Sequence, residues 1–232
     1  FLYVLVVTLA LISFSLSSYG FGPTPCSTLK LYLTLDNVYD LHFNGQYIGS
    51  NGNWLDAESY TLSLQPGKNT IAVKGTDLGV IAGLLAQGDY CGQKILTSNS
   101  WKYSLTVPEY VWATTDFDDS SWSQAVSYGT YQQQGLPWST LNNNQVNNFP
   151  TPSSAQWVWS SRNVLVDWRV IGADTPVYFR YSFDIASPTN HAPTISSCSP
   201  SSSTVTLGNS ATINYAVSEP DADSFSDTVN WG

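Results

Sequence analysis

The stretch LKLYLTLDNVYDLHFNGQYIG, residues 29–49, decides the fold class of this chain. Its first half alternates without a break, with leucines at every second position from Leu29 to Leu35, as expected for a half-buried β-strand. The same period runs from Tyr39 to Phe43 and stops at Asn44-Gly45. Because Asn-Gly tolerates the positive φ angles of a tight turn, the sequence predicts a β-hairpin across residues 43–48.

Other segments repeat the strand signal. Residues 60–64 and 71–73 alternate on either side of the turn residues 66–69, which predicts a second hairpin. Residues 80–86 form a short apolar run typical of a strand buried on both faces, and further alternating strands are predicted at 101–107, 157–159 and 177–183. Residues 116–148, rich in Asp, Ser and Asn, resemble long surface loops. No segment has a sustained helical period, so an all-β fold is expected.

The chain divides into four predicted parts. Residues 1–20 are apolar and uncharged and end in small residues, which is typical of an export signal; an uncleaved membrane anchor is the alternative. A first domain over 27–186 and a short linker over 187–193 follow. Residues 194–232 begin a second β-sandwich with about three strands, too few to close a core. We therefore expect the sequence to be a fragment at both ends.

Composition restricts the partners of the protein. Eight Lys and Arg stand against 17 Asp and Glu, which gives a net charge of −9 with no basic cluster, so nucleic acid is not an expected partner. In an oxidising compartment the three cysteines would tend to pair. Cys26 with Cys91 is the favoured pair, with a stabilisation of about 4 kcal/mol on the chain-entropy model. Separate thiols are the alternative, and Cys198 would be free or paired outside the fragment.

The order of motifs resembles the galactose-binding-domain-like jelly rolls that accompany many glycoside hydrolases. DNVYDLHFNGQYIG (36–49) looks like the hairpin of that family. It is followed in the family's order by Trp54 and by QPGKNTIAV (65–73), AGLLA (82–86), DFDDSSWSQA (116–125), AQWVW (155–159) and VYFR (177–180). This resemblance, which covers about residues 28–185, implies a jelly-roll β-sandwich that serves as a sugar binder, a spacer or an adhesive module.

The second unit resembles the start of an extracellular Ig-like or cadherin-like repeat, on the residues NHAP (190–193) and EPDAD (219–223). Asp221 and Asp223 resemble the acidic calcium ligands between such repeats. Structural calcium is therefore a candidate ligand, although two solvated acids are the simpler interpretation. No other cofactor is expected.

Catalysis finds little support in the residues. Asp116, Asp118 and Asp119 are the densest carboxylate cluster, but their motif is typical of a turn rather than of the paired carboxylates of glycoside hydrolysis. The two histidines, His42 and His191, accompany no nucleophile motif. Zinc spacing is also missing. We therefore predict a non-enzymatic protein.

Carbohydrate binding is the remaining site hypothesis, because it needs exposed aromatic platforms beside amides and carboxylates. Candidate platforms are Trp54, Trp101 and Trp138, with Asn53 and Asp56 close to Trp54 in sequence. Core packing competes with this role for each tryptophan. We expect core or rim packing for Trp122, Trp157 and Trp159. The Asn-rich residues 142–148 are expected to form a flexible loop rather than a ligand site.

These observations favour a non-catalytic, extracellular carbohydrate-binding or carbohydrate-associated module of a larger secreted or cell-surface protein. Its partners would be glycans or glycoproteins. The protein is expected to contact a membrane only during export or through a distal anchor. One alternative is a structural or adhesive surface protein that self-associates without sugar affinity. Another is an accessory domain of a glycoside hydrolase whose catalytic domain lies beyond Gly232.

Overall fold

The computed structural model contains two compact units, Cys26–Ala186 and a second unit made of Phe1–Pro25 with Ser187–Gly232. The candidate functional site lies in the unit Cys26–Ala186. The residues that the structure describes are 13–18, 26–79, 81–107, 111–140, 145–160, 176–186, 194–200, 212–218 and 225–230.

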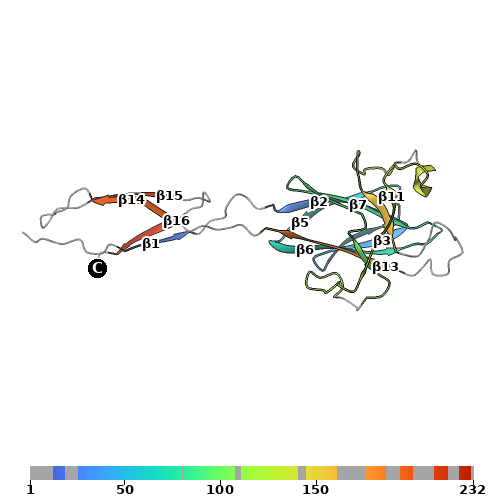
Figure 1. Cartoon of the computed structure of the whole chain (residues 1–232), viewed down its shortest axis with the longest axis horizontal. Helices are drawn as coiled ribbons and strands as arrows, with labels where there is room; N and C mark the ends of the chain where they lie inside the picture. Colours follow the sequence, from blue (N-terminus) through green and yellow to red (C-terminus); the bar gives the residue numbers. More distant parts are fainter. Residues whose placement is uncertain are drawn as a thin grey trace, which may run out of the picture. The chain divides into compact units, whose positions relative to one another are not determined.

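The unit Cys26–Ala186 is an all-β sandwich of two antiparallel sheets, which confirms the predicted fold class (Figure 1). The first sheet has the order β11 (Val126–Thr130), β12 (Gln156–Trp159), β7 (Gly83–Tyr90), β2 (Thr28–Asp36) and β5 (Glu58–Ser63), and β8 (Gln93–Leu96) pairs with β7. The second sheet has the order β10 (Ser123–Gln124), β9 (Lys102–Ser104), β13 (Val177–Ile185), β6 (Gly67–Thr76), β3 (Val38–Phe43) and β4 (Gln46–Asn51).

The predicted alternation fills the space between the two sheets. The four leucines of β2 from Leu29 to Leu35 are at most 1% exposed and meet Tyr39, Leu41 and Phe43 of β3 in one core cluster. The predicted hairpin joins β3 to β4 through Asn44 and Gly45, both of which have positive φ angles. Every second residue of β3 therefore points away from the core, and two of these residues reach the candidate site.

The predicted second hairpin is wrong. β5 pairs with β2 in the first sheet, whereas β6 pairs with β3 and β13 in the second, so the turn after Gln65 carries the chain across the sandwich. The buried Asn69 side chain holds this crossing, because it accepts a hydrogen bond from the Gln65 amide (2.9 Å) and donates one to the Gln65 carbonyl (2.7 Å). Alternation shows which face of a strand is buried, but not which strand is its neighbour.

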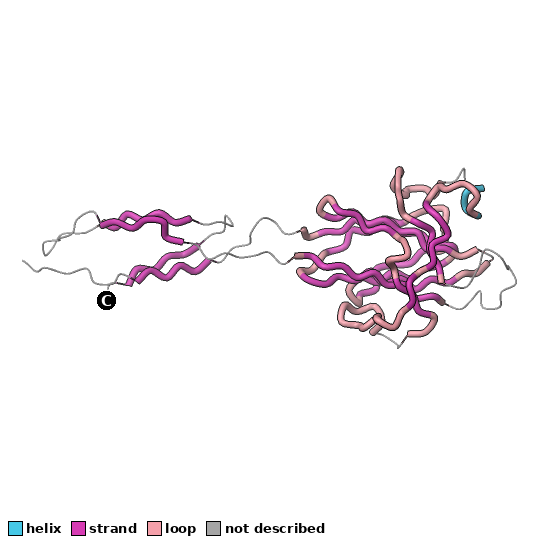
Figure 2. Tube along the Cα trace, viewed as in Figure 1, coloured by secondary structure: helices cyan, strands magenta, loops and turns pink. Residues whose placement is uncertain are grey.

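Loops cover parts of both outer faces of the sandwich (Figure 2). The described residues of 116–148 are more than the surface loops that were predicted, because several of their aromatic side chains pack against the sheets. These residues contain β10, β11 and the short 3₁₀ helix η1 (Pro137–Thr140). A second hydrophobic cluster on the first sheet comprises Ala57, Leu85, Tyr131, Leu136, Trp138, Val146, Phe149, Ala155 and Trp157. A third, on the second sheet, comprises Ala72, Trp112 and Ala113.

Cys26 and Cys91 form a disulfide, the pairing that the sequence favoured, with their Cα atoms 5.7 Å apart. In the other unit β1 (Ser13–Ser18) pairs with β16 (Phe225–Asn230), and β14 (Thr194–Pro200) pairs with β15 (Ile213–Ser218). The export signal stays a prediction, although part of its sequence forms β1. The described residues include no helix long and apolar enough to cross a membrane.

Candidate functional site

Two of the three predicted sugar platforms are packed inside the protein. Trp101 is 0% exposed, stacks on Tyr181 with ring centroids 5.5 Å apart, and donates its indole N–H to the Leu96 carbonyl (3.0 Å). Trp138 is 3% exposed and stacks on Trp157 at 4.2 Å with an interplanar angle of 10°. Because neither ring has a free face, both leave the set of candidates, and core packing is their role.

The three remaining predicted residues lie near the second cluster. Trp54 is half-buried against that cluster, next to Trp138. The Asp56 carboxylate accepts hydrogen bonds from the side-chain amides of Asn53 and Asn147, the latter at 2.8 Å. These bonds tie the loop after β4 to the Asn-rich segment, where Asn147 forms an isolated bridge with Asp56. Asn53, Asp56 and Asn147 bond to one another and so hold the two loops together.

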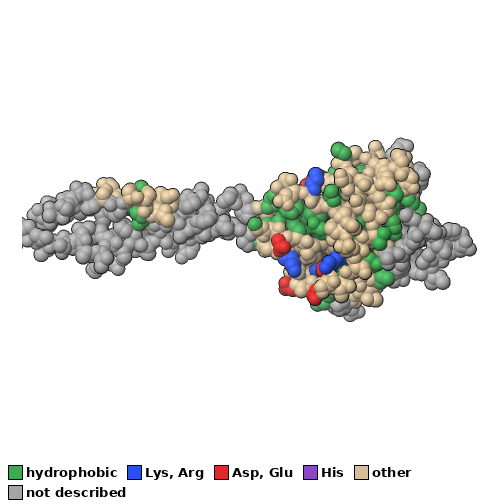
Figure 3. Space-filling model, viewed as in Figure 1, with side chains coloured by type: hydrophobic (Ala, Val, Ile, Leu, Met, Phe, Trp, Pro, Cys, Tyr) green, Lys and Arg blue, Asp and Glu red, His purple; other side chains and the backbone are tan. Residues whose placement is uncertain are grey.

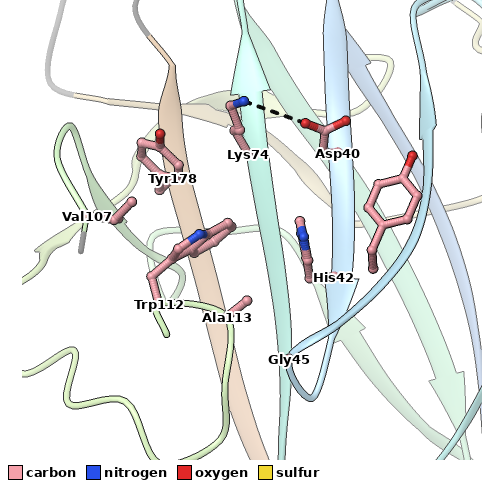
Figure 4. Close-up of a pocket in the computed structure, with 9 residues that line it drawn as sticks. Asp40, His42, Gly45, Lys74, Val107, Trp112, Ala113 and Tyr178 are labelled. Atoms are coloured by element: carbon pink, nitrogen blue, oxygen red, sulfur yellow. Dashed lines mark ion pairs between the residues drawn. The ribbon is translucent and has the colours of Figure 1, made fainter. Parts of the chain in front are cut away.

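The sandwich presents a groove of about 650 Å³ on the outer face of its second sheet (Figure 4). None of the five predicted sugar-binding residues lines it. The lining residues come from β3, β4 and β6, from β13, and from the loop after β9, and they are Asp40, His42, Gly45, Tyr47, Lys74, Val107, Trp112, Ala113 and Tyr178.

Strand pairing explains how distant residues meet on this face. Asp40 of β3 pairs with Lys74 of β6, and Lys74 pairs in turn with Tyr178 of β13, so the three form one row across the sheet. His42, two residues along β3, lies on the same outward face. A bulge between Leu41 and His42 shifts the β4 register and sets Tyr47 opposite His42, in line with the tendency of bulges to redirect side chains.

Aromatic side chains form the walls of the groove. The His42 ring makes edge-to-face contacts with Tyr47 and with Trp112, each at 5.5 Å between centroids, and Trp112 makes another with Tyr178 at 5.0 Å. Tyr47 is 59% exposed, whereas Trp112 is largely buried. Figure 4 shows Trp112 between Tyr178 and His42. Among the described residues, the groove therefore has one freely accessible aromatic ring and a series of fixed ones.

Polar groups lie beside these rings. The Lys74 amine is 3.7 Å from the Asp40 carboxylate, and both side chains are about two-fifths exposed, so the pair is loose and open to solvent. His42 Nδ1 is buried without a hydrogen-bond partner among the described residues. Burial lowers the pKa of His42 against the opposing effect of Asp40, so its ring is neutral at neutral pH. The described lining of the groove thus offers donors and acceptors whose charges balance.

Arg180 fixes the wall that carries Trp112. Its side chain is 1% exposed and donates hydrogen bonds to the carbonyls of Trp112 and Thr114 and to the Asp119 carboxylate, the last two at 3.0 Å. Lys102 donates to the same carboxylate at 2.7 Å. Both cations hold the pKa of Asp119 below its usual range, although burial opposes them. The motif predicted to be a turn does form one, since the Asp118 side chain accepts a hydrogen bond from the Ser120 amide. Its Asp119 also fixes the loop through Arg180.

The same loop rests on the β3–β4 turn. Gly45 has φ +83°, and a Cβ added there would lie 3.2 Å from the Thr114 side chain. Glycine at this position meets both the turn geometry and the close approach of the loop. The β3–β4 turn at Gly45 and the loop at Thr114, about 70 residues apart in the sequence, are thereby brought together at one end of the groove.

A second depression, of about 570 Å³, lies on the first sheet beside the disulfide. Lys30, Asp89 and Lys94 form a row of alternating charge across β2, β7 and β8 there. Lys94 contacts Asp89 at 2.5 Å. Tyr90 is the aromatic residue among those lining this depression, so it lacks the series of rings found in the groove.

Sequence reasoning missed every residue of the groove except His42, which it had considered only for catalysis. The outward positions of β3 were a usable signal, since Asp40 and His42 alternate with buried Tyr39, Leu41 and Phe43. Metal binding gains no site here, because the described residues include no cluster of three or more His, Cys, Asp or Glu suited to an ion. The predicted calcium ligands Asp221 and Asp223 lie outside the described residues.

Comparison with known proteins gives a limited result. No family model and no curated protein matches the chain. A solved lectin from Pleurotus ostreatus in complex with GalNAc is similar over 95% of this chain and 77% of its own, with 17% sequence identity and a TM-score of 0.43. Its apo form gives 15% identity, 95% and 76% coverage, and a TM-score of 0.39. TM-scores this low do not establish a common fold, so the bound sugar concerns that lectin alone.

Proposed function

We propose that the unit Cys26–Ala186 is a non-catalytic carbohydrate-binding module and that its binding site is the groove on the second sheet. The observation that carries the proposal is the exposed Tyr47 ring beside His42 and Trp112, with a row of Asp40, Lys74 and Tyr178 next to it. Sugars present an apolar ring face and a polar hydroxyl edge, and a site that offers aromatic and polar groups side by side matches both.

Each group has a definite part in binding. Tyr47 would contact the C–H face of a sugar ring, and the largely buried Trp112 would add only the part of its ring that lines the groove. Burial of this apolar area provides most of the affinity. Asp40 accepts hydrogen bonds from hydroxyls and Lys74 donates to them. Because the two are held only loosely to one another, at 3.7 Å, they can turn toward a ligand at little cost.

Binding without catalysis is supported by the carboxylates. Asp40 is the one acidic residue among the described residues that line the groove, whereas glycoside hydrolysis generally uses two carboxyl groups that flank the sugar. Asp119 lies on the loop that forms the wall, but its oxygens are engaged by Lys102 and Arg180. The side chains that line the groove suit retention of a glycan rather than its cleavage.

The wider setting belongs to the same proposal. The ordered motifs between residues 28 and 185 support a galactose-binding-domain-like module, and the residues after 190 support a following Ig-like repeat. The apolar start and the Cys26–Cys91 disulfide favour a secreted or cell-surface location. In this setting the module would attach a larger extracellular protein to glycans.

A glycan microarray with the full chain and two variants tests the proposal. Tyr47→Ala removes the most exposed ring of the groove, and Leu78→Ala, which removes a side chain of similar exposure outside it, is the matched control. We expect the parent and Leu78→Ala to bind the same glycans and Tyr47→Ala to lose at least tenfold in signal. Failure of the parent to bind any glycan, or equal binding by Tyr47→Ala, would refute the proposal. Self-association without glycan binding would favour the adhesive alternative.

A further inference from the structure

Two rows of side chains cross the groove in the same direction. The aromatic row runs from Tyr47 to His42 to Trp112, and the polar row runs from Asp40 to Lys74 to Tyr178. The polar row is perpendicular to the strands, because its members are paired residues of neighbouring strands. The aromatic row runs the same way, because Tyr47 and Ala72 pair with His42 from its two sides and Trp112, from the loop after β9, packs in one cluster with Ala72. A ligand that uses both rows must therefore lie across the sheet.

Tyr47 and Trp112 lie on opposite sides of His42. The register puts Tyr47 on one side of His42 and Ala72 on the other, and Trp112 packs in one cluster with Ala72. Each step of the aromatic row measures 5.5 Å between centroids, and Tyr178 adds a further step of 5.0 Å beyond Trp112. The polar row spans three strands, or about 10 Å at the usual strand spacing. One sugar ring covers about one step, so a single ring cannot reach both ends.

The groove also has no excess of charge. Among the part of its lining that the structure describes, Asp40 and Lys74 are the charged side chains, and they face one another across two paired strands. A carboxylate or sulfate on the ligand would gain from Lys74 but meet Asp40 and the field of a chain with net charge −9. An uncharged ligand avoids this conflict and uses both groups as hydrogen-bond partners.

On the basis of the proposed function, we infer that the groove binds a neutral oligosaccharide of at least two sugar residues, lying across β4, β3, β6 and β13. One sugar ring contacts Tyr47 and His42. The next ring lies toward Trp112 and Tyr178, with the hydroxyl edges of both along the polar row. Figure 4 shows the labelled members of this path, from His42 past Trp112 to Tyr178.

Isothermal titration calorimetry with sugars of increasing length tests this inference. The probes are the mono-, di- and trisaccharides of glucose, galactose and mannose, with trigalacturonate as the anionic probe. For the neutral series that binds, we expect affinity to rise at least tenfold from one residue to three, and trigalacturonate to bind at least tenfold more weakly than the neutral trisaccharide.

Two variants locate the ends of the ligand. Tyr178→Ala should lower the affinity for the trisaccharide at least fivefold more than that for the monosaccharide, whereas Tyr47→Ala should weaken both by similar factors. Tyr178→Phe, which keeps the ring and loses only the hydroxyl, gives a milder reading should the alanine variant fold poorly. Leu78→Ala is the control for all lengths.

The outcomes separate the two proposals. Equal affinity for one residue and three, or tighter binding of trigalacturonate, overturns the inference and leaves the proposed carbohydrate function in place. Absence of binding to every probe and on the microarray removes the proposed function and the inference together.

Discussion

Replacement of Asp119 by Asn should loosen the loop that carries Trp112. Asp119 receives the side chains of Arg180 and Lys102, and Arg180 is 1% exposed. Removal of one partner from a buried ion pair costs about 3–5 kcal/mol, but Asp119 is 19% exposed and Arg180 keeps its carbonyl acceptors, so we expect about 2–3 kcal/mol. The amide keeps the size of the carboxylate and removes only its charge.

Urea denaturation at neutral pH measures this cost. With a slope of about 2 kcal/mol/M for a domain of this size, the midpoint should fall by about 1–1.5 M. Asp118→Asn is a matched control in the adjacent position, because Asp118 is exposed and its carboxylate bonds the backbone amide (2.9 Å) and the side chain of Ser120 within the turn, and the Asn side-chain oxygen can accept the amide bond. Its midpoint should change by less than about 0.3 M.

The glycan affinity of Asp119→Asn supplies an independent measure, because Arg180 bonds the Trp112 carbonyl directly. We expect the affinity to fall while that of Asp118→Asn is kept. Equal denaturation midpoints for the two variants would show that the Arg180–Asp119 pair does not lock the loop, and the reasoning would fail.

Three further predictions concern the body of the sandwich. Burial raises the pKa of Asp36 to about 6, above its unfolded value near 3.8. Between these two pH values the folded state keeps a proton that the unfolded state has lost, so the free energy of unfolding should fall by up to about 3 kcal/mol as the pH rises from the unfolded value through 6. Asp36→Asn should flatten this dependence in urea titrations between pH 4 and 7, and an unchanged profile would count against the assignment. Loss of the Cys26–Cys91 disulfide, by reduction or by a double Cys→Ala change, should cost about 4 kcal/mol on the chain-entropy model, and a loss under about 1 kcal/mol would contradict it. Trp138→Ala should cost about 3–5 kcal/mol in thermal or urea unfolding and leave glycan affinity intact, whereas a selective loss of affinity would restore the tryptophan as a sugar platform.

The sequence predicted the strands well because burial on one face imposes a period of two. The leucines of β2 and the Asn44-Gly45 turn were each readable from neighbouring residues alone. The pairing of β5 and β6 was not, because a crossing between sheets and a hairpin both need two alternating strands and a polar turn. What distinguishes them is the buried Asn69 side chain, whose bonds to Gln65 exist only in the folded turn.

The candidate site was harder to predict because its members meet only through tertiary structure. Trp54 and Trp138 attracted attention as tryptophans after turn residues, yet Trp138 fills a gap beside Gly83, where an added Cβ would lie 2.6 Å from its ring. The exposed ring of the groove belongs to Tyr47, an ordinary strand residue redirected by a bulge. The loop that places Trp112 in the groove is held by a hydrogen bond from Arg180, which lies 68 residues further along the chain. Neither the bulge nor the bond from Arg180 can be predicted from a local sequence pattern.

The charged side chains do not by themselves indicate a binding site. On the face shown in Figure 3, the Lys, Arg, Asp and Glu side chains are few, and most of them lie together in one region with both signs side by side. Affinity for a ligand must then come from shape and aromatic contact rather than from long-range attraction, and it should depend little on salt.

Amide chemical-shift mapping with a ¹⁵N-labelled chain tests the central claim most directly, because it locates the ligand without a mutation. The probe is the glycan that binds best on the microarray. Binding in the groove predicts the largest shifts at Asp40, His42, Tyr47 and Lys74, with small shifts at Lys94. Shifts centred instead on the second depression around Asp89 and Lys94, or on the loop of Trp54, would contradict the account.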